Sequence, residues 1–395
     1  MKTKKILRMN PGIGLFLVGI FILSKPAPAQ LLTFALNDLP ETSELKLSDI
    51  GAMEISYIPL ETSDVSRNIS INKAIFTKSH ILIHFYNEIY LFRTDGSFVT
   101  RIGSVGKGPG EFTTAHSVDI DARIGTVYVA DGWQKKYLVF DLEGNFVRSF
   151  KAPIQAAVDF RLIGSRILSY HFNILGNITD SYILLDTLGK VIRRFPNKYS
   201  WKSAGVINNL HLLGENLFYN YNGKIIKGEM YSDTLFTYEA GRFEPYRIIY
   251  QGEYRIDPEI RTENSDDIFR KVYIPMNLFE CSHYLFYEFL SPDRKETEPL
   301  IFIGSNKSDL KVVVNPVKGL TNDLDGGPGF WPKTSSDDNT LVSWVDAGDL
   351  KKHIAGEEFK RAVVANTEKK EELRKLADSL KETDNPVLIL VRLKK

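Results

Sequence analysis

The chain of 395 residues is poor in cysteine, in net charge and in long hydrophobic runs. Its one cysteine, Cys281, cannot form an internal disulfide, so a disulfide scaffold is excluded and the residue is expected to be a small buried hydrophobe. The formal net charge is only +1. An excess of basic residues marks most nucleic-acid-binding domains, so no nucleic-acid partner is expected.

The main apolar run lies at the N-terminus. A basic segment at 2–8 precedes an apolar stretch at 13–23, and small residues follow at 27–29. This order predicts a signal peptide over 1–29, with a mature chain that begins at Gln30. The stretch is shorter than the about 20 residues of a membrane-spanning helix, so no transmembrane segment is expected after cleavage. An uncleaved anchor is the alternative.

No cysteine follows this apolar stretch closely enough to carry a lipid. The mature protein is therefore expected to be periplasmic or secreted, and not lipid-anchored.

Alternating apolar and polar residues dominate the rest of the sequence. Segments 88–103 and 136–150 read almost alike, each with two alternating runs around a turn that contains glycine. Period-2 alternation on both sides of such a turn predicts a β-hairpin. A glycine-rich loop and another strand pair separate the two hairpins, so the repeating unit has four strands.

Similar hairpin turns recur about every 50 residues, a period that indicates a propeller or a solenoid. The five candidate turns are Asp95-Gly96, Glu143-Gly144, Leu188-Gly189, Ala240-Gly241 and Asn306-Lys307. Strand-like segments at 54–60 and 386–393 remain at the two ends. We expect these ends to share one blade and so to remove the exposed edge of an open sheet. The sequence predicts an all-β fold, a single six-bladed β-propeller over 30–395.

A helical insertion is expected at about 349–382, near the C-terminus. Two faces carry apolar residues at helical spacing. The first comprises Leu350, Ile354, Phe359 and Val363, and the second Leu373, Leu376 and Leu380. Charged residues fill the remaining positions, as on a solvated helix face. The insertion is predicted to pack on the outer flank of the ring; docking of a partner is the alternative.

Segment 101–150 resembles the NHL repeat, with its G-x-G-x-G-x-F loop, its "iyVaD" strand and its final strand. The wider chain resembles the secreted six-bladed β-propellers of Gram-negative bacteria, through segments 232–238, 322–332 and 384–394. The resemblance implies the fold, whereas most members of that family have no assigned activity. This chain departs from many relatives because it lacks their lipidation cysteine.

Ligands of propellers usually bind on the rim that carries two sets of loops. One set joins the last strand of a blade to the next blade, and the other joins the second strand to the third. His116, Trp133, Gln134 and Lys135 lie in such segments and are the first candidates for ligand contact. The further candidates are Lys107, Glu111, His171, Asn173, Trp201 and Tyr221. The turn at 221–224 is assigned here to the second-to-third set.

Two motifs receive structural interpretations. The loop at 106–112 lacks the G-K-[ST] ending of a phosphate-binding loop, so we interpret it as a blade-to-blade connection in which Gly110 adopts positive φ. Segment 323–326 begins like a calcium loop, but Thr334 stands where the acidic twelfth residue belongs, so a turn is expected. Asp131 is predicted to accept hydrogen bonds from the turn that follows it.

The sequence shows no catalytic signature, and the catalytic residues are unknown. It has no G-x-S-x-G elbow and no H-E-x-x-H motif. We expect an exported binding module for a small polar ligand, a glycan, a peptide or a protein partner, without a cofactor. The alternative is a metal-dependent enzyme of the lyase or lactonase type, with calcium or zinc at the ring centre. The residues available for it are the histidines His116, His171, His211 and His283 and the aspartates Asp119, Asp121, Asp131 and Asp159. Of the histidines, only His116 and His171 are expected to reach the same rim.

Overall fold

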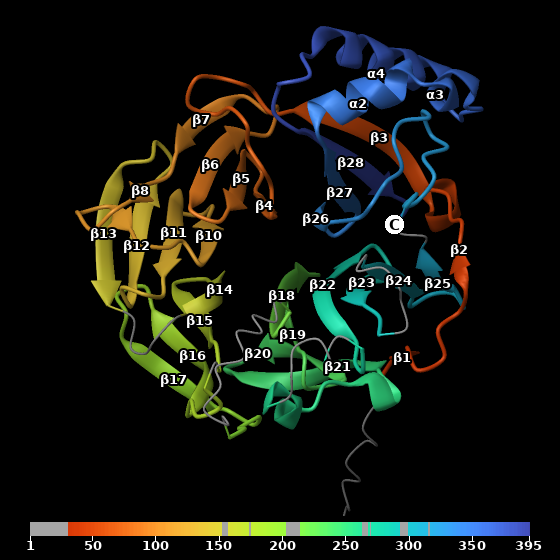
Figure 1. Ribbon diagram of the computed structural model, residues 1–395. Helices are drawn as coiled ribbons and strands as arrows, with labels where there is room; N and C mark the ends of the chain where they lie inside the picture. Colours follow the sequence, from red (N-terminus) through yellow and green to blue (C-terminus); the bar gives the residue numbers. More distant parts are fainter. Residues whose placement is uncertain are drawn as a thin grey trace, which may run out of the picture. The chain divides into compact units, whose positions relative to one another are not determined.

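The structure is a computed structural model that describes residues 31–151, 157–173, 175–202, 214–262, 268, 270–292, 299–314 and 317–395. The predicted signal peptide lies outside these residues. The segment Leu32–Lys395 forms one compact unit. Within it, six sheets surround a common axis, as Figure 1 shows. The prediction of a six-bladed β-propeller is confirmed.

Blades 1 to 3 follow one another in sequence, and each is a sheet of four antiparallel strands. Blade 1 comprises β4 (Lys73–Phe76), β5 (His80–Phe85), β6 (Glu88–Arg93) and β7 (Phe98–Arg101). Blade 2 comprises β10 (Ser117–Asp121), β11 (Thr126–Asp131), β12 (Lys136–Asp141) and β13 (Phe146–Lys151). Blade 3 comprises β14 (Ala157–Ile163), β15 (Arg166–His171), β16 (Asp180–Asp186) and β17 (Val191–Pro196). The first strand of each blade lies nearest the axis (Figure 1).

Blades 4 and 5 each gain a fifth strand from the N-terminal segment. Blade 4 comprises β18 (Asn216–Tyr221), β19 (Lys224–Glu229), β20 (Thr234–Glu239) and β21 (Arg242–Tyr250), with β1 (Thr33–Ala35) parallel to β21. Blade 5 comprises β22 (Ile274–Cys281), β23 (Tyr284–Leu290), β24 (Leu300–Ser305) and β25 (Lys311–Val314), with β2 (Thr42–Ser43) parallel to β25. These added strands cover two outer edges that a four-strand repeat leaves open.

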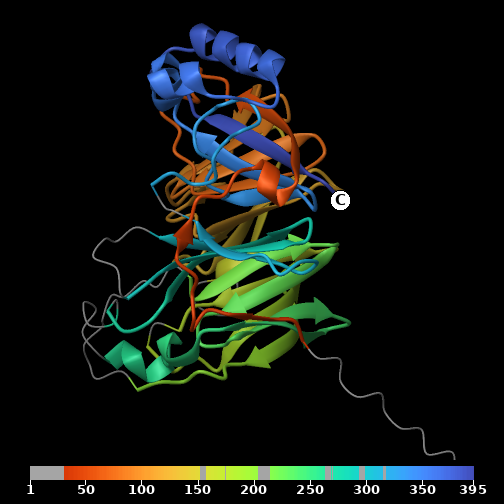
Figure 2. The ribbon, with the colours of Figure 1, turned by 90° about the vertical axis from the view of Figure 1, so that its right-hand side faces the viewer.

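Blade 6 closes the ring with both ends of the chain, as predicted. It comprises β26 (Thr334–Asp337), β27 (Thr340–Val345), β28 (Val387–Leu393) and, outermost, β3 (Ala52–Pro59). The antiparallel register runs from Val387 opposite Pro59 to Leu393 opposite Ala52. The N-terminal strap, residues 33–59, therefore runs along the outside of blades 4, 5 and 6 (Figures 1 and 2).

The strap is anchored by apolar side chains. Phe34, Leu36, Leu47 and Ile50 are each 1% exposed or less. The ring of Phe34 packs edge-on against Phe302, with centroids 5.8 Å apart. A Cβ at Gly304 would lie only 2.5 Å from the Phe34 ring. The glycine therefore makes the room that the strap needs.

The helical insertion joins β27 to β28. It comprises α2 (Ala347–Ala355), α3 (Glu357–Arg361) and α4 (Thr367–Ser379). Leu350, Ile354, Phe359 and Leu373 are buried together, which confirms the predicted packing. Val363 is an exception: it is 95% exposed, because the helix ends at Arg361 and the expected face does not continue. Within the described residues, no helix combines the length and the apolarity needed to cross a bilayer.

Short elements complete the description. They are the parallel pair β8 (Ser104–Val105) and β9 (Glu111–Phe112), and the 3₁₀ turns η1 (Ser48–Ile50), η2 (Gly252–Tyr254) and η3 (Pro258–Thr262).

The hairpin turns have a second role that period-2 patterning does not reveal. Gly96 has φ +88°, as such a turn requires, and a Cβ on it would lie only 2.2 Å from the carbonyl oxygen of Pro59 in the preceding blade. Gly144 meets Arg101 of blade 1 in the same way, at 3.0 Å. The turn between the two outermost strands thus packs on the end of the previous blade's outer strand.

Candidate functional site

The topology defines two rims. The upper rim carries the connections between blades and the loops from second to third strand, including 86–87, 102–116 and 132–135. Six of the ten predicted contact residues lie together on this rim at blade 2: Lys107, Glu111, His116, Trp133, Gln134 and Lys135. Tyr221 does not, because its turn joins the first strand of blade 4 to the second and so lies on the opposite rim. The assignment of the 221–224 turn was wrong.

Tyr221 is also buried, and its hydroxyl donates to the backbone carbonyl of Ser282. This contact joins blades 4 and 5, so the side chain serves packing.

Two exposed aromatic rings stand out on the upper rim. Tyr86 is 70% exposed in the loop of blade 1, and Trp133 is 64% exposed in the equivalent loop of blade 2. His116 lies beside Trp133, with ring centroids 5.8 Å apart in an edge-to-face arrangement. We call Tyr86, His116 and Trp133 the aromatic site.

Backbone hydrogen bonds fix the three segments of the aromatic site. His84 Nε2 lies 2.7 Å from the carbonyl oxygen of Tyr86 and 3.0 Å from that of Ala115. The amide of Ala115 donates to Asn87 Oδ1 at 2.9 Å. The amide of Gly132 donates to His116 Nδ1 at 3.1 Å. Since residues 115 and 116 are adjacent, the loops of blades 1 and 2 are tied through one connection and offer their rings in fixed positions.

Both histidines are neutral at neutral pH. Burial, with Lys73 nearby, lowers the pKa of His84 to about 4. Because both of its acceptors are carbonyl oxygens, its proton is on Nε2. Burial also lowers the pKa of His116. Its Nδ1 accepts from Gly132, so the proton is on Nε2 here too.

Tyr86 adopts a backbone conformation that is rare for a bulky residue. Its φ is +50°, in the left-handed region that favours glycine. Strain of this kind persists where the surroundings hold it in place, and here the hydrogen bond from His84 to the Tyr86 carbonyl does so. The exposed position of the Tyr86 ring is therefore accompanied by backbone strain at this residue.

Several predicted contact residues instead hold the glycine-rich loop together. Glu111 Oε2 accepts from the amide of Gly108 at 2.7 Å. Gln134 Nε2 donates to Thr113 Oγ1 at 2.6 Å. The loop is a blade-to-blade connection, as predicted, whereas Lys107 and Lys135 remain exposed beside the aromatic site.

Asp131 is fully buried and accepts from the amides of Thr113 at 2.6 Å and of Gln134 at 3.0 Å. Its predicted structural role is confirmed.

The three candidates on blade 3 are largely structural. His171 is 1% exposed and lies 2.9 Å from Ser169 Oγ. Asn173 is 3% exposed; its amide group donates to the Tyr199 carbonyl and accepts from the Ile178 amide. Trp201 packs on Gly176, where a Cβ would lie 2.0 Å from the tryptophan carbonyl oxygen.

The upper rim of blades 1 to 3 also exposes other large apolar side chains. Five of the described loops on this rim carry one each: Val65, Tyr86, Val105, Trp133 and Leu175, between 49% and 70% exposed. The opposite rim of the same blades exposes Ile124 and Leu188. Exposed apolar groups of the described loops are thus more frequent on the upper rim of these blades than on the opposite rim.

Close to the aromatic site, the innermost strands of blades 1 to 3 bring polar and charged side chains together. We call this set the axial cluster: Lys73 on β4, Ser117 and Asp119 on β10, and Asp159 and Arg161 on β14. Asp159 Oδ1 accepts from Ser117 Oγ at 2.9 Å and from Arg161 at 3.2 Å. Lys73 Nζ lies 3.6 Å from the same oxygen.

Burial and the neighbouring cations shift the pKa values of the two aspartates in opposite directions. Burial raises the pKa of Asp159, but Arg161 and Lys73 outweigh it and leave that pKa below its usual value. At Asp119 burial prevails and the pKa is raised. Burial and Arg161 lower the pKa of Lys73.

No three histidine, cysteine or acidic side chains among the described residues are placed to hold a metal ion. His211 lies outside the described residues. Cys281 is fully buried, as predicted, and burial raises the pKa of its thiol.

The aspartates of segment 323–326 hold local structure. Asp323 accepts from the amide of Ser48 at 3.1 Å, and Asp325 is buried and its Oδ1 accepts from the Gly327 amide at 3.0 Å. This segment is a turn, as predicted.

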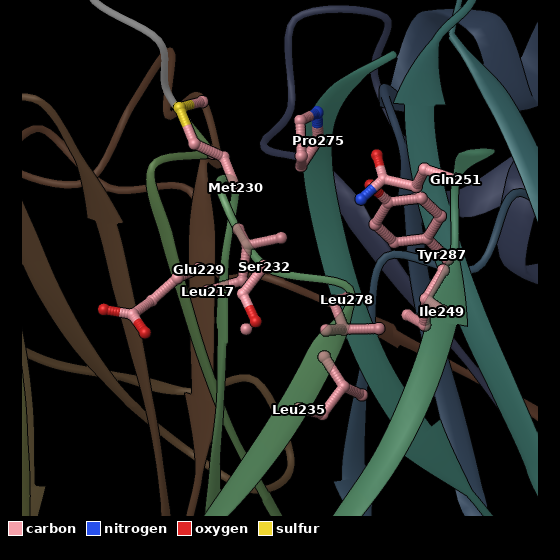
Figure 3. Close-up of a pocket in the computed structure, with 12 residues that line it drawn as sticks. Leu217, Glu229, Met230, Ser232, Leu235, Ile249, Gln251, Pro275, Leu278 and Tyr287 are labelled. Carbon is pink, nitrogen blue, oxygen red and sulfur yellow. The ribbon is translucent and has the colours of Figure 1, made fainter. Parts of the chain in front are cut away.

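A pocket between blades 4 and 5 is too small for an organic ligand. It encloses about 20 Å³, room for about one water molecule. Figure 3 shows its apolar wall, with Leu217, Leu235 and Leu278, and the side chain of Gln251. Gln251 Oε1 is buried and accepts no hydrogen bond from the described residues, so a structural water fits the pocket better than a ligand.

A wider groove of about 470 Å³ lies where β3 ends, beside the β6–β7 turn. Its carboxylates Glu61, Asp95 and Asp384 accept from the backbone amides of Phe98, Ser97 and Lys381. They therefore serve local turns.

Sequence reasoning missed Tyr86 and Lys73. Segment 85–88 is expected to be a rim loop, but Tyr86 follows a largely apolar strand, so nothing in the sequence indicates that its ring is exposed. Lys73 begins a strand of four residues, too short for its inward direction to be predicted.

The fold and the rim define the chain as a six-bladed β-propeller whose upper rim presents exposed aromatic groups beside an ionisable axial cluster. The chain belongs to the DUF4934 family, described as a domain of unknown function, which matches residues 33–392.

Among solved structures it is similar to a Bacteroides fragilis protein provisionally described as exported, at 19% identity and a TM-score of 0.70, covering 93% of this chain and 100% of that one. It also matches a DUF4221 family member from Bacteroides vulgatus, at 12% identity and a TM-score of 0.49, over 87% and 97% of the chains. The search of curated proteins finds no match.

Proposed function

We propose that this protein is an exported binding module that holds its ligand on the upper rim of blades 1 and 2. The observation that carries the proposal is the pair of exposed rings, Tyr86 and Trp133, in equivalent loops tied to one connection. Aromatic faces that are already fixed lose little entropy on binding and offer a stacking surface to a glycan, a peptide or a small polar ligand.

Neighbouring residues complete the proposed site. His116 supplies an imidazole beside Trp133, and the exposed Lys107 and Lys135 supply charge at its border. Gln134 and Glu111 support the loop and contact a ligand only at its edge. His171, Asn173 and Trp201 support the neighbouring blade.

A metal-dependent enzyme is not favoured. Such an enzyme needs three or four converging ligands, and the described part of the chain brings no such set together. The aspartates near the axis are instead bonded to amides or paired with cations, as at Asp119 and Asp159.

We propose a periplasmic or secreted location, with residues 1–29 removed as a signal peptide. The basic start, the apolar stretch and the small residues before Gln30 support it. Amino-terminal sequencing of the protein from the periplasm and the medium tests this, and a chain that begins at Met1 would contradict it.

The binding proposal is tested with residues 30–395 labelled with 5-fluorotryptophan. The four tryptophans give four ¹⁹F signals, and Trp133→Phe identifies one. Neutral tetrasaccharides, tetragalacturonate and tetrapeptides are titrated separately at millimolar concentration. A ligand on the upper rim shifts the Trp133 signal, and Trp133→Ala abolishes its binding. If none of the three classes moves that signal, the upper rim of blades 1 and 2 is not the binding site.

A further inference from the structure

We infer that the ligand is an uncharged oligosaccharide whose hydroxyl groups are read by Lys73 and Asp159 of the axial cluster. The inference rests on the proposed binding function and goes beyond it in naming the ligand class and two recognition residues at the ring axis.

Lys73 and Asp159 retain unused hydrogen-bonding capacity. Lys73 Nζ lies 3.5 Å from the Val118 carbonyl oxygen and 3.6 Å from Asp159 Oδ1. Charge-assisted hydrogen bonds are usually 2.7–2.9 Å long, so both contacts are loose. All hydrogen bonds that Asp159 accepts from the described residues end on Oδ1, which leaves Oδ2 as an acceptor.

Both side chains are largely buried but keep part of their surface exposed. The side chain of Lys73 is 27% exposed and that of Asp159 is 21% exposed. A donor and an acceptor thus stand side by side with part of their surface open to a ligand, Lys73 as the first residue of β4 and Asp159 as the third of β14. Figure 1 shows these two strands nearest the axis in their blades.

The charge balance of the axial cluster favours an uncharged ligand. Lys73 and Arg161 offset Asp119 and Asp159, so the formal charge of the four side chains is zero. Lys107 and Lys135 are exposed at the border of the site, where water and salt screen their charge. Beside the axial cluster an ionic ligand would lose its hydration with no opposite charge to spare, which is costly. A hydroxyl group both donates and accepts, so adjacent hydroxyls can accept from Lys73 and donate to Asp159 without disturbing the balance.

A continuous set of contacts links this pair to the aromatic site. Trp133 contacts His116, and His116 precedes Ser117, whose hydroxyl donates to Asp159. On the other side, Lys73 is the cross-strand partner of His84, which bonds to the Tyr86 carbonyl. A saccharide that stacks on Trp133 and also reaches Asp159 spans several side chains, so a chain of sugar rings fits better than a single ring.

The test compares ligand classes with the labelled protein described above. Cellotetraose and mannotetraose represent uncharged saccharides, and tetragalacturonate and a tetrapeptide serve as charged alternatives. We expect an uncharged tetrasaccharide to shift the Trp133 signal and the charged probes to leave it unmoved. Asp159→Asn and Lys73→Gln should each weaken binding about tenfold or more, since each removes a charge-assisted hydrogen bond.

Lys190→Gln and Asp309→Asn are the matched controls. Both residues are exposed in turns of the opposite rim, and affinity should be unchanged. If Asp159→Asn fails to fold, Lys73→Gln carries the test, because the contacts of Lys73 are loose.

The outcomes separate the two proposals. Tetragalacturonate or the peptide shifting the Trp133 signal in place of the uncharged saccharides would overturn the ligand class and keep the binding function. Uncharged saccharides that bind Asp159→Asn and Lys73→Gln as tightly as the wild type would remove the axial cluster from recognition. No shift with any probe would overturn both proposals.

Discussion

Blades 4 to 6 and blades 1 to 3 share the same four-strand plan but differ in what covers their outer edges. Blades 4 to 6, the covered half, carry the strap on their outer edges and the helices α2 to α4. One apolar cluster runs from Phe34 in the strap through all three of these blades. Blades 1 to 3, the bare half, are four-stranded sheets with separate, smaller clusters between neighbours.

The buried polar groups of the two halves differ in their exposure and in the lengths of their contacts. In the covered half, Glu280 is 1% exposed and accepts from Tyr219 and Arg247 at 2.8 and 2.7 Å. In the bare half, the contacts of Lys73 are looser, and the side chains of Lys73 and Asp159 remain partly exposed. The comparison suggests that the covered half supplies stability, whereas the bare half keeps unused polar capacity and exposed rings for a ligand.

Two isosteric substitutions, one in each half, should show the largest difference in the free energy of unfolding. Glu280→Gln leaves Arg247 buried without its counter-charge, and breaking a buried ion pair costs about 3–5 kcal/mol. Asp159→Asn keeps the shape of a side chain whose cluster retains some solvent exposure, so the cost should be smaller, about 1–2 kcal/mol. Urea unfolding of both variants measures the difference.

Equal costs for the two variants would mean that the axial cluster is as structural as the Glu280 pair. The distinction between the halves would then be wrong.

Acid should destabilise the bare half first, because His84 joins blades 1 and 2. Its folded pKa is about 4 and an unfolded histidine has about 6.5, so between these values the unfolded chain binds the additional proton. Stability should therefore fall as pH decreases from about 6.5 to 4, by up to about 3 kcal/mol, and not change from this group above pH 7.5.

Hydrogen exchange at pH 5 locates the loss, which should begin in blades 1 and 2. His84→Gln keeps an N–H donor without titrating, so its stability curve should be flatter than that of the wild type. Parallel curves for the two proteins would contradict the role of His84.

The contrast between the halves also explains what the sequence could predict. Blade number, ring closure and the helical insertion follow from alternation and helical spacing in long segments. The strap strands β1 and β2 have only three and two residues and pair in parallel, so no periodicity reveals them.

The candidate site was predictable in part. Trp133 and His116 stand out because they follow recognisable strands, and Asp131 because a turn follows it. The Asn222-Gly223 turn is compatible with either rim, so only the strand register places Tyr221. Lys73 and Asp159 come together through strands far apart in sequence, a proximity that one sequence does not contain. The likeness to NHL repeats stays a prediction.

Glycine substitutions separate backbone strain from packing between blades. Gly110, in the bare half, has φ +76°, and an added Cβ would lie 2.9 Å from Phe146 Cβ. Gly223, in the covered half, has φ +69° but no atom within 4 Å of an added Cβ. Gly110→Val should cost about 2–3 kcal/mol and Gly223→Val about 1–2 kcal/mol.

Thermal unfolding of the two variants shows which substitution destabilises the protein more. If Gly223→Val were the more damaging, the contact between the glycine-rich loop and Phe146 would not matter for stability, and φ alone would explain both costs.

The smallest effect on stability is expected at the aromatic site. Trp133→Ala removes an exposed ring and should change the free energy of unfolding by less than about 0.5 kcal/mol. Tyr86→Gly removes the other ring and also relieves the left-handed strain at φ +50°, which offsets the greater freedom of glycine in the unfolded chain. Its stability should therefore match that of the wild type, while the ¹⁹F titration shows weaker binding. If urea unfolding showed both variants to be strongly destabilised, the rings would be part of the packing between blades 1 and 2, and the bare half would have no exposed surface set aside for a ligand.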